Sequence, residues 1–244
     1  MVCIQCVKRS RKNEVRTYHR GPFHRPSQSV YCTCGDQWAG GNGSCKEYRQ
    51  VQGASGPGYT GFSGKEQQSG EKDSLYLICV NKKGRGLINM DSQIPNKAAL
   101  EWIKAGHLFP EKIQVIPEKT YGNSRFDIYV CSEKRKAFIE VKGVTLESDN
   151  IARFPDAPTE RGVKHLRELI HCMQEGYEAY LLLVIQMKGV DRFEPNWETH
   201  REFGETLQEA ERAGVHILAY DCLVEPDRME IQDSVPVCLA SDWK

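Results

Sequence analysis

The pattern of apolar and polar positions divides the chain near residue 75. From Leu75 onward, apolar residues recur at helical or strand spacing, whereas residues 1–74 show neither spacing over any useful length. The pattern predicts strands at 75–80, 113–116, 125–131, 136–142, 179–187 and 215–220, and helices at about 96–105, 159–175 and 199–213. This order of elements predicts an α/β fold with a mixed central sheet flanked by helices, preceded by an irregular N-terminal segment.

Local signals define the ends of these elements. Asn96 and Thr159 are suited to cap the first two helices, and a glycine follows each of the three helices. The run 179–187 is nearly all apolar and long, which is typical of a central strand covered on both faces. Gln186 is the polar exception within Leu181–Met187, so we expect it to have a buried partner and consider it a candidate to face a site.

Residues 1–74 have an unusual composition. They contain no leucine, yet they hold 11 of the 21 glycines and five of the ten cysteines. Cys3 and Cys6 form a C-x-x-C pair, but the cysteines and histidines that follow lack the second tight pair that structural zinc sites use. We therefore predict no zinc, and expect this segment to be poorly folded as written.

A reading-frame error would explain that composition. With permitted third bases, the stretch 29–58 read one base forward encodes a peptide whose apolar positions alternate as in paired strands. The hypothesis is that much of the segment up to about Ser74 is translated out of frame. Codons that cannot give such a peptide would contradict it.

Cysteine placement and hydropathy indicate a cytoplasmic protein. Four cysteines sit singly inside apolar strand or helix patterns, as reduced, buried thiols do: Cys79, Cys131, Cys172 and Cys222. The start of the chain lacks the continuous apolar region of a secretory signal, and no apolar run approaches the roughly 18 residues of a membrane span. We expect no membrane partner.

The formal net charge of zero conceals an asymmetry. Residues 1–74 carry 11 Lys+Arg and 6 Asp+Glu, a net charge of +5, so the remainder carries −5. Net charge therefore argues neither for nor against a nucleic-acid partner.

The candidate chemistry lies on two neighbouring predicted strands. Asp127 belongs to the run 125–131, in which Phe126, Ile128 and Val130 are expected to share the opposite face. Glu140 and Lys142 share one face of the next strand, so a hairpin would bring Asp127 close to Glu140. Two adjacent carboxylates favour a divalent cation, and an all-oxygen site suits Mg²⁺ or Mn²⁺. Lys142 would then orient a metal-bound water or stabilise developing negative charge.

Basic residues open the helix that follows. The spacing of Arg161, Lys164 and His165 predicts a shared face at the helix N-terminus, where cations suit a phosphate backbone. An ordinary charged helix face is the alternative. Glu101 and Glu118 are candidates for a third carboxylate beside the metal, and the alternative for each is a surface position.

Six sequence stretches together resemble the sugar fermentation stimulation protein family, SfsA. They are LINMDSQIPN, YGNSRFD, FIEVKGVTL, FPDAPTERGVKHL, FEPNW and GVHILAYDC, within about Leu87 to Val237. The resemblance implies a cytoplasmic DNA-binding protein linked to the regulation of sugar (maltose) metabolism. It implies an N-terminal OB-like barrel and a C-terminal domain like the PD-(D/E)xK nucleases, with a restriction-endonuclease-like α-β-β-β-α-β core. Asp127, Glu140 and Lys142 match the nuclease-site positions.

The resemblance also divides the chain. Residues 1–74 stand where the barrel is expected, 75–237 form the nuclease-like domain and 238–244 form a tail. Three functions stay open: a DNA-binding protein with an active metal site, a DNA-binding regulator without cleavage, and a phosphoester hydrolase that acts on something other than DNA.

Overall fold

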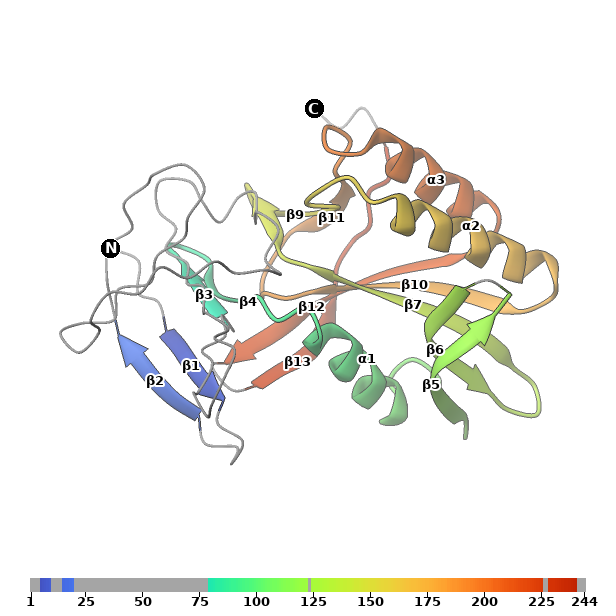
Figure 1. Cartoon of the computed structure of the whole chain (residues 1–244), viewed down its shortest axis with the longest axis horizontal. Helices are drawn as coiled ribbons and strands as arrows, with labels where there is room; N and C mark the ends of the chain where they lie inside the picture. The colour runs from blue at the N-terminus through green and yellow to red at the C-terminus, as the bar shows by residue number, and fades with distance from the viewer. Residues whose placement is uncertain (1–4, 10–14, 20–78, 123, 226–227, 241–244) are drawn as a thin grey trace, which may run out of the picture.

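The computed structural model describes residues 5–9, 15–19, 79–122, 124–225 and 228–240, the first two ranges as backbone only (Figure 1). In chain order the strands and helices are β1 (Gln5–Arg9), β2 (Val15–His19), β3 (Cys79–Lys82), β4 (Gly86–Asn89), α1 (Ile94–Lys104), β5 (Gln114–Tyr121), β6 (Ser124–Cys131), β7 (Lys136–Val144), β8 (Leu146–Ser148), β9 (Ile151–Phe154), α2 (Glu160–Gln174), β10 (Glu178–Ile185), β11 (Arg192–Pro195), α3 (Arg201–Arg212), β12 (His216–Glu225) and β13 (Arg228–Ser234).

A six-stranded mixed sheet forms the centre of the fold. Its strand order is β13-β12-β10-β7-β6-β5. The three middle strands β7, β10 and β12 are parallel, and the strands beyond them are antiparallel to their neighbours. The predicted α/β class and the mixed sheet flanked by helices are therefore confirmed.

Helices cover both faces of this sheet. Helices α2 and α3 lie on one face and α1 lies on the other (Figure 1). Alternate residues of β10 enter the two cores: Leu181 and Leu183 pack with α2 and α3, and Leu182 and Val184 pack with α1. A strand buried on both faces needs apolar side chains at every position, which explains the unbroken apolar run.

Two smaller sheets lie beside one end of the main sheet. The first is the β3–β4 hairpin, and the second has the order β11-β9-β8. The β3–β4 hairpin joins the main sheet through the Asn89 N–H, which donates to the Gln186 carbonyl across 2.9 Å. None of the short strands β4, β8, β9 and β11 was predicted from the apolar pattern.

The predicted helix ends are only partly confirmed. Thr159 caps α2 by accepting a hydrogen bond from the Gly162 N–H at 3.0 Å. Positive φ angles follow the three helices, as a left-handed C-terminal glycine requires: Gly106, Gly176 and Gly214. The capping prediction for Asn96 is wrong, because α1 begins at Ile94 with Pro95 in its first turn and Asn96 lies inside the helix.

The N-terminal segment contains one described feature. Strands β1 and β2 form an antiparallel hairpin that the apolar pattern did not predict. The rest of 1–74, including the stretch 29–58 of the reading-frame hypothesis and Cys3, Cys32, Cys34 and Cys45, lies outside the described residues.

The four cysteines predicted to be reduced are free thiols. Cys79, Cys172 and Cys222 are buried, whereas Cys131 is only half-buried because it ends a strand near the sheet edge. Among the described helices, none has the length and apolar character that crossing a membrane requires.

Candidate metal centre

The candidate site lies where strands β6 and β7 separate. Their backbone pairing runs from Cys131 to Ile128 on β6. One residue further, the Asp127 side chain replaces the backbone partner: its Oδ2 accepts a hydrogen bond from the Val141 N–H at 2.8 Å. The predicted strict alternation fails at this point. Ile128 and Val130 pack on the α1 side, but Phe126 packs on the α2 side.

Asp127 is held at both of its oxygens. Its Oδ1 accepts a hydrogen bond from the Asn96 side-chain amide of α1 at 2.7 Å. Burial, and next the negative charge of Glu140, raise the pKa of Asp127 above its usual value, against the opposing effects of the Val141 N–H, Lys142 and Asn96. Asp127 lies one residue beyond the last paired position of the two strands and is held by the N–H of the residue after Glu140.

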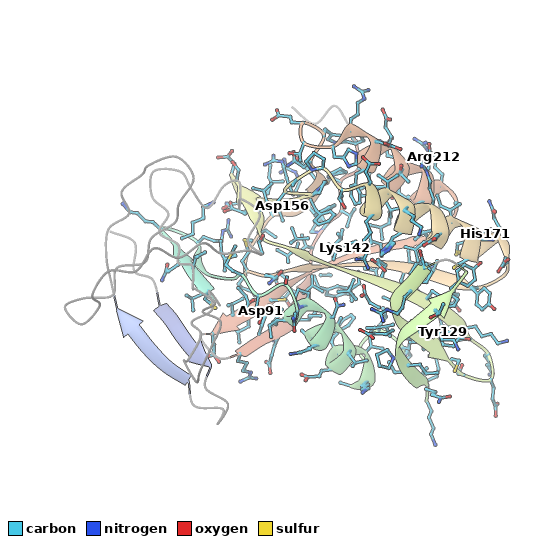
Figure 2. All side chains as sticks on the ribbon, in the orientation of Figure 1. Asp91, Tyr129, Lys142, Asp156, His171 and Arg212 are labelled. Atoms are coloured by element: carbon cyan, nitrogen blue, oxygen red, sulfur yellow. The ribbon has the colours of Figure 1, made fainter. Side chains whose placement is uncertain are left out.

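Glu140 is held at one oxygen. Both the Lys142 ammonium and the His165 Nδ1 contact Oε1, while Oε2 is buried without a hydrogen-bond partner. Only 2% of Glu140 is exposed. Burial would raise its pKa, but the hydrogen bond from His165 and the charge of Lys142 outweigh burial and lower it. Lys142 lies in the layer between the sheet and α2 (Figure 2).

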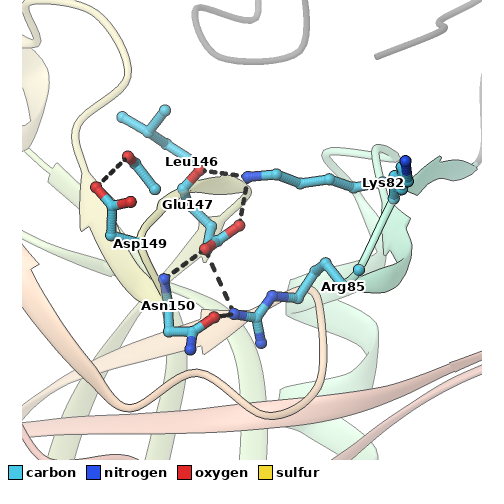
Figure 3. Close-up of a pocket in the computed structure, with 9 residues that line it drawn as sticks. Lys82, Arg85, Leu146, Glu147, Asp149 and Asn150 are labelled. Atoms are coloured by element: carbon cyan, nitrogen blue, oxygen red, sulfur yellow. Dashed lines mark hydrogen bonds and ion pairs between the residues drawn. The ribbon is translucent and has the colours of Figure 1, made fainter. Parts of the chain in front are cut away.

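The other buried carboxylates of the described residues differ from Glu140. Each has hydrogen bonds at both oxygens. Glu147 binds Lys82 at one oxygen and Arg85 with the Asn150 N–H at the other (Figure 3). Glu194 binds Arg153 and Arg192, and Asp221 binds Lys188 and two backbone N–H groups. The free oxygen thus distinguishes Glu140 from these three buried carboxylates; among the described residues, the partly exposed Glu168, which pairs with Lys164 through Oε1, also has a buried Oε2 without a hydrogen bond.

The predicted basic face of α2 is divided between interior and surface. His165 is buried and contacts Glu140, and its Nε2 lies 3.4 Å from the Arg161 Nε. Arg161 and Lys164 are exposed, and Lys164 pairs with Glu168 one turn along. Arg161 and His165 contact each other as their i, i+4 spacing predicted, whereas His165 points into the core and Lys164 to solvent, because successive helical residues point about 100° apart.

Two of the three accessory candidates are exposed side chains. Glu101 is exposed on α1. Glu118 is exposed on β5 and pairs with Arg125 at 3.4 Å. Gln186 has the buried partners that its sequence position required, since its amide donates to the Asn89 and Asp91 carbonyls at 3.0 and 3.2 Å. Its Oε1 borders Gly143, the residue after Lys142.

Sequence reasoning assigned Asn96 to the wrong role. Asn96 was read as a helix cap, and nothing in the local pattern shows that it reaches Asp127 from a different layer of the fold. His165 was predicted to bind phosphate. Its contact with Glu140 depends on how α2 lies on the sheet, which no spacing within α2 encodes.

The donor set fits a divalent cation that prefers oxygen ligands. Asp127 and Glu140 supply two neighbouring carboxylates, and the Glu140 Oε2 is a buried acceptor without a hydrogen bond. The Asp127 oxygens each accept one hydrogen bond, and a carboxylate oxygen has a second lone pair available. No thiol or imidazole is needed, so the chemistry resembles a Mg²⁺ or Mn²⁺ site rather than a zinc site.

A second cluster of possible metal ligands, formed by two glutamates and a histidine, is less suited to a metal ion. Ligand atoms of Glu160, His200 and Glu202 lie within 4.8 Å of one another near the surface. The His200 Nδ1 accepts a hydrogen bond from the Thr159 N–H, so the proton of the neutral ring is on Nε2, the nitrogen that faces Glu160. Glu202 is also paired with Arg167 at 2.8 Å.

Comparison with known proteins identifies the family. A family model described as the sugar fermentation stimulation protein RE domain matches residues 93–228, more than half of the 244-residue chain. The chain belongs to this family. Two sugar fermentation stimulation protein homologs, from Clostridium beijerinckii and Ruminiclostridium cellulolyticum, are 55% and 52% identical to it over 183 residues. Each match covers 75% of this chain and 80% of the relative.

A solved SfsA structure has the same fold. The structure of SfsA from Pyrococcus furiosus in complex with Ca²⁺ superposes with a TM-score of 0.67. The match covers 97% of this chain and 94% of the other, at 23% sequence identity. Asp127, Glu140, Lys142 and His165 all fall within the part of the chain that the SfsA family model matches.

Proposed function

We propose that this SfsA-family chain is a DNA-binding protein with a metal-dependent nuclease site formed by Asp127, Glu140 and Lys142. The observation that carries the proposal is the buried Glu140 Oε2, which has no hydrogen-bond partner and belongs to the residue before Val141, whose N–H holds Asp127. A buried charged oxygen without a partner is costly, and a bound cation would supply the missing interaction. The P. furiosus SfsA structure in complex with Ca²⁺ supports a cation-binding role in this fold.

Each residue has a distinct role in this proposal. When bound, a Mg²⁺ or Mn²⁺ ion supplies an acidified water and neutralises charge on the phosphate. Asp127 and Glu140 hold the ion. The Lys142 ammonium is fixed by Glu140 and has further N–H donors, which can orient a nucleophilic water or bind a phosphate oxygen.

The start of α2 supplies a phosphate-binding surface for the DNA backbone. Arg161 and Lys164 are exposed on its first turns, and the helix N-terminus adds partial positive charge. Binding through these groups should weaken as the salt concentration rises, because each phosphate contact releases counterions. A link to the regulation of sugar (maltose) metabolism rests on the family resemblance and forms part of the proposal.

A nicking assay tests the proposal. Purified protein is incubated with supercoiled plasmid or single-stranded DNA and Mg²⁺ or Mn²⁺, and salt-dependent binding to duplex DNA is measured in parallel. We expect Glu140→Gln to abolish cleavage and Lys142→Ala to reduce it roughly 10²-fold or more. Glu133→Gln, in the exposed β6–β7 turn, and Lys136→Ala, on the same strand as Lys142, serve as matched controls.

The other two candidate functions are distinct outcomes. Salt-sensitive DNA binding without cleavage at either metal would indicate a regulator that uses the nuclease fold only for binding. Metal-dependent hydrolysis of small phosphoesters without DNA binding would indicate a different substrate. If the Glu140→Gln variant still cleaves DNA, the nuclease site is not the one formed by Asp127, Glu140 and Lys142.

A further inference from the structure

We propose that His165 is a positioning residue for the metal centre: its Nδ1–H, fixed by Arg161, directs the free oxygen of Glu140 to the metal. This inference rests on the proposed function, because it assigns the residues that orient one of the proposed metal ligands. It replaces the predicted phosphate-binding role of His165.

The contact with Arg161 selects the tautomer of His165. The Arg161 Nε carries a hydrogen and is only a donor, and it faces the His165 Nε2 at 3.4 Å. The Nε2 must then be the acceptor, so the ring proton lies on Nδ1. That proton points to the Glu140 Oε1. Two hydrogen bonds, from Arg161 to His165 and from His165 to Glu140, thus connect the surface to the buried carboxylate, and each donor has an acceptor.

The two oxygens of the Glu140 carboxylate have different surroundings. Its two donors, His165 and Lys142, converge on Oε1 and leave Oε2 without a partner. Glu147, a buried carboxylate that joins separate strands, instead uses both oxygens. His165 and Lys142 therefore hold the Glu140 side chain in one orientation and leave its Oε2 available to a ligand. Groups that orient metal ligands in this way typically change metal affinity about 10–100-fold when removed.

An aromatic contact holds the His165 ring in place. His165 is buried, and its ring meets the edge of Phe126 with the centroids 6.3 Å apart. Phe126 directly precedes Asp127, so one aromatic contact ties the orientation of His165 to the strand that carries the other carboxylate. His165 therefore contacts one proposed metal ligand, Glu140, and the residue that precedes the other.

Isosteric variants test the donor position. The side-chain amide of His165→Asn can place its N–H near the position of Nδ1, whereas that of His165→Gln reaches the position of Nε2. Mn²⁺ binding to the full chain is measured by electron paramagnetic resonance. We expect affinity to fall about 10–100-fold in His165→Gln and His165→Ala, and to stay within about threefold of wild type in His165→Asn.

Arg161 provides an independent test. Arg161→Gln should lower Mn²⁺ affinity as well, because the ring loses the donor that fixes its tautomer. The matched control is Arg167→Gln, on the same helix, whose guanidinium instead pairs with Glu202 at 2.8 Å. Equal effects of the two substitutions would show that only net charge matters and would overturn the proposal.

The tautomer can be observed without metal. In ¹⁵N-labelled, metal-free protein at mildly alkaline pH, nitrogen shifts should show the His165 proton on Nδ1, with the signals assigned by their loss in His165→Asn. A proton on Nε2 overturns the proposal. So does wild-type Mn²⁺ affinity in a folded His165→Ala variant. A wild-type protein that binds no Mn²⁺ overturns the proposed function itself, which distinguishes the two failures.

Discussion

The Asn96 side-chain amide donates a hydrogen bond to the Asp127 Oδ1 across 2.7 Å, and so joins the first turn of α1 to the strand that carries the first carboxylate of the site. The Val141 N–H holds the other oxygen from β7. Asp127 is therefore fixed from two elements that lie in different layers of the fold. Its orientation depends on α1 as much as on the hairpin that contains it.

Asn96→Ala should weaken Mn²⁺ binding about 10-fold or more, because Asp127 loses one of the two groups that fix its orientation. The same change should lower the free energy of unfolding by only about 1–2 kcal/mol. Titration of Mn²⁺ and urea denaturation measure the two effects. Gln93→Ala is the control, since Gln93 precedes the same helix without a side-chain capping bond. Unchanged Mn²⁺ affinity in Asn96→Ala would contradict the prediction.

Gly143→Ala should destabilise the fold by about 1–3 kcal/mol. A Cβ at this position would lie 2.4 Å from the Gln186 Oε1 and 2.7 Å from the Pro95 Cγ, so one of these groups must move. Urea denaturation of the two single variants and the double variant with Gln186→Ala measures the coupling. The double variant should lose less stability than the two single losses combined, because Gln186→Ala removes part of the clash. Additive losses would argue against a shared contact.

Glu147→Gln should lower stability by about 1–3 kcal/mol at neutral pH, since it weakens charged hydrogen bonds. Burial would raise the pKa of Glu147, but the hydrogen bonds from Lys82 and the Asn150 N–H outweigh burial and lower it. A lowered pKa contributes stability above the unfolded value of about 4.3, and that stability is lost as the pH falls through the folded pKa.

The difference in unfolding free energy between wild type and Glu147→Gln should therefore shrink as the pH drops below about 4. Urea denaturation between neutral and acidic pH measures this difference. Asp149→Asn, at an exposed neighbouring position, serves as the control. A difference that stays constant over the range would show that Glu147 acts through packing rather than through its charge.

The buried cysteines should resist alkylation. Burial raises the pKa of Cys79, Cys172 and Cys222 to about 12, and the thiolate is the reactive form. At pH 8 their thiolate fraction is roughly a thousandfold below that of an ordinary cysteine. Among the five cysteines from Cys79 onward, mass spectrometry after iodoacetamide treatment should find Cys131 and Cys238, which are half-buried, modified first. Equal rates at Cys222 and Cys238 would show that the native core opens readily.

The sequence predicted the elements whose signal is local. The all-apolar run of β10 and the Thr159 cap of α2 are both where they were expected. The short strands β8 and β11 were not predicted, because three or four residues are too few to show a periodic pattern. The strand alternation also failed at Phe126, where β6 leaves β7 and the side chain turns to the other core.

Within the candidate site, some contacts could likewise be predicted from the sequence and others could not. Asp127 and Glu140 are joined by a hairpin, so their proximity follows from local pairing alone. Asn96 and His165 reach the same site from helices that pack on opposite faces of the sheet. Such contacts depend on the tertiary arrangement, and no spacing along one element reveals them.

The β3–β4 hairpin lies before the stretch 93–228 that the family model matches, yet it shares a core with that stretch. Val80 and Ile88 are buried in the core cluster of α2 and α3, and the backbone around Asn89 accepts the Gln186 amide beside Gly143. A chain shortened to the matched residues would expose this apolar surface and leave Gln186 without its acceptors. A shortened chain that preserves the surroundings of Lys142 must therefore keep the β3–β4 hairpin, which lies outside the family boundary.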